Sequence, residues 1–126
     1  VKPDRARSVA EARQQLALRG MLDPWYLEEF LTAEECGLVD RNRNAFFKAY
    51  KNGTGVVPGV PESVLEKLVD NLSLAGTPDD LAGHIARLRA LHRLGLDEVA
   101  LKLHEDQAEA IRLIGERVLP VLREAA

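Results

Sequence analysis

The chain contains very little cysteine and no excess of basic charge. Cys36 is the only cysteine among 126 residues, which excludes an internal disulfide and favours a reducing, cytoplasmic setting. The 17 Lys and Arg residues are outnumbered by 20 Asp and Glu residues, which gives a formal net charge of −3. Because no basic field is available to hold a phosphate backbone, we expect no nucleic-acid partner.

Long apolar runs and targeting signals are missing as well. No run of about 18 apolar residues occurs, and no secretory signal-peptide pattern is present, so we expect no membrane partner. The composition, 46% hydrophobic and 29% charged, fits one globular unit and leaves no room for two ordinary domains.

Motifs for metal binding and hydrolysis are also lacking. His84 and His92 lie eight residues apart on one expected helix, with no cysteine or carboxylate at ligand spacing, so we expect no metal site. The sequence contains neither an HExxH motif nor a nucleophile elbow, which argues against hydrolysis. These patterns therefore name no catalytic residue.

The first 60 residues predict helices. Small apolar residues recur at helical spacing over residues 4–20, which indicates close packing, and Gly20 offers a stop. A second helix restarts at Asp23-Pro24, and a capping box over 32–35 opens a third that reaches about residue 51. Nearly all aromatic residues lie between 25 and 50, where they form either a local core or an aromatic ligand pocket.

The second half predicts a βαβ unit. We expect a short strand over 72–75, an amphipathic helix that ends at Gly95, a second strand over 97–103, and a final helix that Pro120 ends or kinks. Parallel strands need a larger sheet with both faces covered. We therefore expect either self-association through the open strand edges or the remainder of a larger sheet.

Four residues follow the expected strands at their carboxyl ends, where parallel α/β proteins bind ligands. Gly76 and Thr77 open a helix whose first amides suit an anion, although the local sequence favours a plain turn with a helix cap. Lys102 and His104 share one strand face, where they line a cleft or else lie at the surface.

Three blocks of sequence carry a family resemblance: residues 73–80 (SLAGTPDD), 94–99 (LGLDEV) and 110–120 (AIRLIGERVLP). In this order they resemble the C-terminal end of luciferase-like flavin- or deazaflavin-dependent oxidoreductases. The resemblance implies an α/β fold, with this chain as the C-terminal part of a (β/α)8 TIM barrel: 1–60 a helical insertion, 61–126 the last two βα units. The first five or so strands would lie outside the chain.

The resemblance also implies a function for the intact parent enzyme. It would use FMN or coenzyme F420 for hydride transfer or monooxygenation of a small organic substrate, with Gly76 and Thr77 at the cofactor and Lys102 and His104 lining the cleft. In isolation the chain would be inactive. The alternative is a helical protein-interaction module without catalysis, which would be a monomer indifferent to both cofactors.

Overall fold

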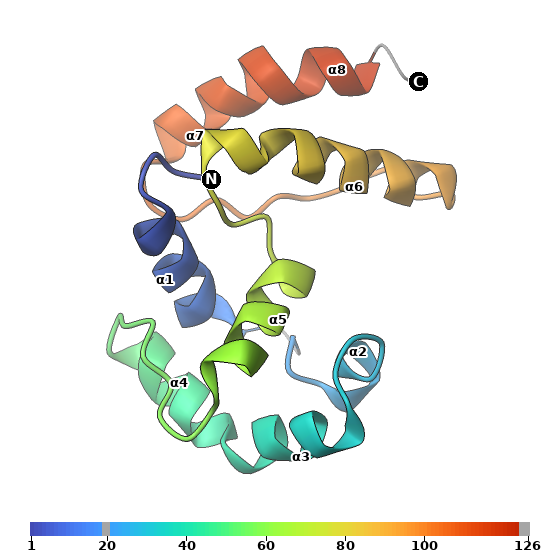
Figure 1. Cartoon of the computed structure of the whole chain (residues 1–126). Helices are drawn as coiled ribbons and strands as arrows, with labels where there is room; N and C mark the ends of the chain where they lie inside the picture. The colour runs from blue at the N-terminus through green and yellow to red at the C-terminus, as the bar shows by residue number, and fades with distance from the viewer. Residues whose placement is uncertain (19–20, 124–126) are drawn as a thin grey trace.

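The structure, a computed structural model, describes residues 1–18 and 21–123, and its regular elements are helices (Figure 1). They are α1 (Arg5–Gln15), α2 (Pro24–Leu27), α3 (Ala33–Arg41), α4 (Arg43–Lys51), α5 (Glu62–Leu72), α6 (Leu81–Arg93), α7 (Gln107–Leu113) and α8 (Leu119–Arg123), with a 3₁₀ turn at Pro78–Asp80 and a π-helical turn at Ile114–Val118. Elements α1 to α5 form one lobe, and α6 lies beside α7 and α8 in a second lobe (Figure 1).

Local signals set the helix starts. Asp4 caps α1 by accepting a hydrogen bond from the amide of Arg7, and the predicted capping box of Thr32 and Glu35 opens α3. The expected helix to residue 51 is divided at Asn42 into α3 and α4. The expected stop at Gly20 lies outside the described residues.

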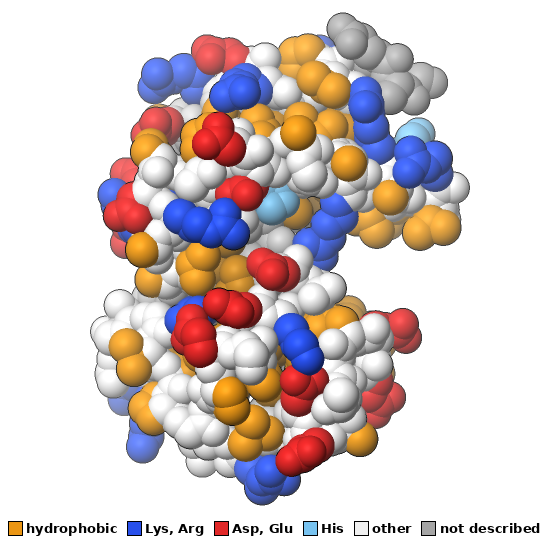
Figure 2. Space-filling view, viewed as in Figure 1, with side chains coloured by type: hydrophobic (Ala, Val, Ile, Leu, Met, Phe, Trp, Pro, Cys, Tyr) orange, Lys and Arg blue, Asp and Glu red, His pale blue; other side chains and the backbone are white. Residues whose placement is uncertain are grey.

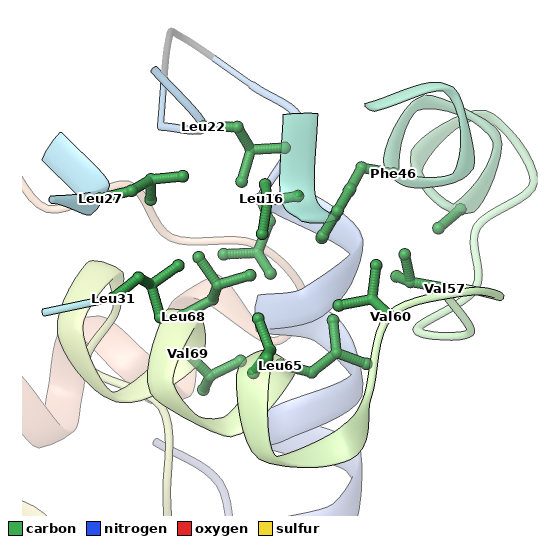
Figure 3. Close-up of a cluster of buried hydrophobic side chains, with 13 residues drawn as sticks. Leu16, Leu22, Leu27, Leu31, Phe46, Val57, Val60, Leu65, Leu68 and Val69 are labelled. Carbon is green, nitrogen blue, oxygen red and sulfur yellow. The ribbon is translucent and has the colours of Figure 1, made fainter. Parts of the chain in front are cut away.

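The first lobe holds the main core, in which side chains of α1, α5 and the intervening segments point toward one another (Figure 3). Its buried members are Leu16, Leu22, Leu27, Leu31, Val39, Phe46, Ala49, Val57, Val60, Val64, Leu65, Leu68 and Val69. Close packing of α1 is confirmed at Gly55, where an added Cβ would lie 2.9 Å from the Cα of Ala10. The connector after α4 thus rests directly on the backbone of α1.

The aromatic residues are divided between core and surface. Phe46 is fully buried, whereas Trp25 is 65% exposed and stacks on Tyr26 with ring centroids 3.6 Å apart. Phe47 and Tyr50 on α4 are also exposed. The aromatic residues therefore do not form one core.

The predicted strands over 72–75 and 97–103 are wrong, because no strand occurs among the residues that the structure describes. Leu72 ends α5, and the amide of Ser73 still donates to the carbonyl of Val69 at 3.0 Å. Arg87 of α6 donates to the carbonyls of Asp70 and Ser73 at 2.7 and 3.1 Å, so these groups are not available to a sheet. Residues 96–104 are extended but irregular.

The predicted α/β barrel class is therefore wrong for the described residues, which contain no sheet. A strand forms only where a neighbouring strand satisfies its backbone amides and carbonyls. The division into 1–60 and 61–126 stays a prediction. No helix within 1–18 or 21–123 is both long and apolar enough to cross a bilayer.

Pro120 does not end the last helix. It is the second residue of α8 and directly follows the π-helical turn at Ile114–Val118. A proline lacks the amide hydrogen and crowds the carbonyl four residues earlier, and a widened turn accommodates both effects. The chain thus continues helically from Gln107 to Arg123.

Candidate functional site

A cavity of about 700 Å³ lies between the two lobes and is the principal candidate site. Its walls come from α1, the segment 72–75, α6, the extended segment 100–106 and α7. Apolar side chains make most of the lining, among them Leu16, Leu72, Leu81, Ile85, Leu103 and Val118. The volume lies in the range usual for sites that bind organic molecules of the size of a drug or cofactor.

Five charged residues surround part of this cavity, and we call them the mouth cluster: Lys2, Arg7, Glu11, Glu105 and Asp106. The Nζ atom of Lys2 lies 2.9 Å from Glu11 Oε1 and 2.8 Å from Asp106 Oδ2. Arg7 lies 2.8 Å from Glu105 and 3.1 Å from Asp106. These pairs hold the extended segment against α1.

The basic members of the cluster favour the ionised forms of Asp106 and Glu105. The hydrogen bond and charge of Lys2 lower the pKa of Asp106 from its ordinary value, and the hydrogen bond from Arg7 lowers that of Glu105. Asp106 also has a φ of +55°, an unfavourable conformation for any residue except glycine and, to a lesser degree, Asn or Asp. Aspartate is thus one of the few side chains suited to this backbone position next to the ion pairs.

The structure brings Lys102 and His104 together at the cavity, where both are lining residues. His104 is half-buried, and burial lowers the pKa of its imidazole, with the charge of nearby Lys102 acting in the same direction. Within the described part of the chain, Lys102 forms no ion pair, so its ammonium group is available to an anion.

Gly76 and Thr77 lie outside the cavity lining and form a helix cap. The amide of Gly76 donates to the hydroxyl of buried Ser8 at 2.9 Å, and the amide of Thr77 donates to Asp80 Oδ2 at 2.7 Å. Arg5 donates to the same carboxylate oxygen at 2.6 Å.

Asp80 thus occupies the position at which an external anion would meet these amides. The hydrogen bond from the Thr77 amide, followed by that from Arg5, lowers the pKa of Asp80, so the carboxylate stays charged. An anion would have to displace it. The role of Gly76 and Thr77 in cofactor binding stays a prediction.

Most polar residues of the cavity lining were not predicted from the sequence, and Ser8 and His84 are two of them. Ser8 is 4% exposed and joins α1 to Gly76, and His84 Nε2 lies 3.0 Å from the carbonyl of Ala75. The contact of Ser8 joins segments 68 residues apart, and the contact of His84 spans the turn between Ala75 and α6.

The described residues contain no group of three or more His, Cys, Asp or Glu side chains arranged to hold a metal ion. The cavity is thus an apolar chamber whose lining also includes two imidazoles, His84 and His104, and the charged side chains of the mouth cluster.

Comparison with known proteins gives one informative similarity. The chain is 30% identical over 122 residues to a 5,10-methylenetetrahydromethanopterin reductase of Archaeoglobus fulgidus, which covers 95% of this chain and 34% of that protein. The chain spans about a third of that reductase. No family model matches the chain, and no solved structure matches it.

Proposed function

We propose that this chain is part of a luciferase-like oxidoreductase and contributes one wall of the cleft that holds an organic substrate and its redox cofactor. Similarity to a protein named as a reductase supports the oxidoreductase part of this proposal. The three sequence blocks at 73–80, 94–99 and 110–120 support the choice of family. The observation that carries the proposal is the 700 Å³ apolar cavity with Lys102 and His104 at its edge.

The cavity residues fit a flavin or deazaflavin in their chemistry. An aliphatic lining suits the faces of a planar ring, and Lys102 offers a cation to an anionic side chain of the cofactor. FMN or coenzyme F420, when bound, supplies hydride transfer. The protein residues would orient the ring, exclude water through Leu72, Ile85 and Leu103, and keep His104 neutral by burial.

Titration of the chain with F420 and, separately, with FMN tests this proposal. Fluorescence anisotropy of the cofactor is expected to rise saturably with protein concentration for one of the two. Lys102→Glu places a negative charge where the anionic part would lie and should weaken binding at least about tenfold, since one lost charge-assisted contact is worth 1.4 kcal/mol or more.

The matched control is Lys67→Glu, which changes an exposed lysine paired with Glu35 on the other lobe. It should leave cofactor binding unchanged. No saturable signal for either cofactor, or equal weakening by both variants, would contradict the proposed site.

A second candidate function is a helical protein-interaction module. The observation that favours it is the exposure of Trp25, Tyr26, Phe47 and Tyr50 on α2 and α4. Aromatic residues are enriched at the centres of protein interfaces. This function requires no cofactor, so the same titration separates it from the first.

A further inference from the structure

The two imidazoles that line the cavity differ in their hydrogen bonds. His84 Nε2 lies 3.0 Å from the carbonyl oxygen of Ala75, so this ring is already engaged by the backbone. The imidazole of His104 makes no hydrogen bond with any other residue of 1–18 and 21–123. Because a half-buried polar ring gains from each hydrogen bond that it forms, the nitrogens of His104 are open to a ligand.

The members of the mouth cluster offer a ligand less, because they pair with one another. Lys2 Nζ lies 2.9 Å from Glu11 and 2.8 Å from Asp106. Arg7 lies 2.8 Å from Glu105. Figure 2 shows charged side chains of both signs on the surfaces that border the notch between the lobes. A ligand that enters the cavity would have to break these ion pairs in order to use their charges.

His104 is also less exposed than Lys102, the other predicted residue of this edge. Lys102 is exposed, whereas His104 is half-buried and borders both the apolar cavity and an adjoining polar hollow of about 470 Å³. Gln14 and Gln107 are among the polar residues of that hollow. A neutral imidazole has one nitrogen that donates and one that accepts, so one nitrogen can serve each hollow.

The surroundings of His104 favour the neutral form of its imidazole. Burial lowers its pKa most, and the charges of Lys102 and Lys2 act in the same direction. Glu11 of α1 opposes them, and the neighbouring Glu105 is paired within the mouth cluster. A neutral ring retains the acceptor nitrogen that protonation would remove.

We propose that His104 is the recognition residue of the cavity and that its imidazole accepts a hydrogen bond from the hydroxyl group of an otherwise apolar organic ligand. The apolar lining would hold the body of such a ligand. A ligand without the hydroxyl group would leave the nitrogen desolvated and unpaired, so it binds less well. The inference rests on the proposed function, because both place a ligand in this cavity, and it adds the chemical class of that ligand.

Binding of phenol and toluene to the chain tests the proposal, because these molecules differ only in a hydroxyl and a methyl group. Shifts of backbone amide signals in NMR spectra give both dissociation constants. The measured quantity is the ratio of phenol affinity to toluene affinity, which cancels changes that affect the cavity as a whole. His104→Phe keeps a ring but removes both nitrogens, so we expect it to lower this ratio about tenfold. An unchanged ratio overturns the proposal.

The matched control is His92→Phe, which makes the same exchange at an exposed histidine of α6 outside the cavity lining. It should leave the ratio of the wild-type chain unchanged. An equal fall of the ratio in the two variants overturns the proposal, because the effect would then not arise in the cavity.

The pH dependence of phenol binding decides the question if His104→Phe fails to fold. Protonation occupies the acceptor nitrogen, so the phenol affinity of the wild-type chain is expected to be full above the pKa of His104 and to fall as the pH decreases through it. His104→Gln offers a carbonyl acceptor that does not titrate, so its phenol affinity should show no such fall. A wild-type affinity that does not change with pH, or the same fall in His104→Gln, overturns the proposal.

The result is distinguishable from that of the cofactor titration, since the binding of phenol and toluene involves no cofactor. Binding of F420 or FMN together with a phenol-to-toluene ratio that does not depend on His104 would overturn this inference and leave the proposed function standing. Absence of binding by both phenol and toluene would overturn this inference equally, and the cofactor titration would still decide the proposed function.

Discussion

At the scale of single residues, the turn before α6 depends on a glycine. Gly76 has a φ of +142°, and an added Cβ would lie 2.5 Å from Asp80 Oδ2, the oxygen that also binds Thr77 and Arg5. A side chain here would therefore strain the backbone and displace the carboxylate that caps the turn.

We expect Gly76→Ala to lower the free energy of unfolding by about 1–3 kcal/mol, because the new methyl group both strains the backbone at positive φ and clashes with the Asp80 carboxylate. Chemical denaturation measures this change. Gly83→Ala in α6 is the matched control, since no atom lies within 4 Å of its added Cβ and alanine favours helix by up to about 1 kcal/mol. Equal effects of the two substitutions would refute the strain at Gly76.

At the scale of elements, the features that could be predicted from the sequence are those that depend only on residues close by in the chain, such as helix caps. The capping box at Thr32 and Glu35 and the cap at Thr77 were correctly located, because a cap needs only the next three residues. The strands at 72–75 and 97–103 were not, because strand pairing depends on distant segments, and in the first segment Arg87 binds the carbonyl of Ser73 instead.

The candidate site likewise depends on contacts between distant parts of the chain, which the sequence alone did not predict. Lys102 and His104 both line the cavity, but Leu101 and Leu103 of the opposite expected face line it too, so the alternation of a strand does not explain their position. The contribution of Ser8 does not follow from local geometry either, since its partner Gly76 is 68 residues away. The separation of Gly76 and Thr77 from the cavity also depends on packing that no local pattern records.

The helix formed by α7, the π-helical turn and α8 gives a prediction at this scale. Pro120→Ala restores a backbone donor and removes the clash with the preceding turn, so we expect a gain of about 1–3 kcal/mol in the free energy of unfolding. Chemical denaturation is again the measurement.

Pro78→Ala is the comparison variant for Pro120→Ala. Pro78 is the first residue of its helical turn, where proline is favourable, so this change should cost roughly 0.5 kcal/mol. A loss of stability with Pro120→Ala would show that the widened turn is preferred for another reason.

At the scale of the whole molecule, the two lobes are unequally stabilised. The main core contains 13 buried apolar residues, and the cluster under α6 and α8 contains three. Local opening follows the number of buried contacts, so the second lobe should open without the first.

Native-state hydrogen exchange of dilute protein tests this asymmetry. Amides of α5 are expected to need at least about 1 kcal/mol more opening free energy than those of α6 and α7, because α5 presents four buried side chains to the main core. Identical opening free energies in α5 and α6 would show that the chain unfolds as one cooperative unit.

The ion pair between Lys2 and Asp106 joins residues 104 positions apart and closes almost the whole chain into one loop. Closing a loop of this length costs about 4 kcal/mol of chain entropy, and this single contact brings the two ends of the described chain together. The cavity beneath the mouth cluster therefore has walls from both ends of the described chain, so removing either α1 or the segment from residue 100 to α7 would open it.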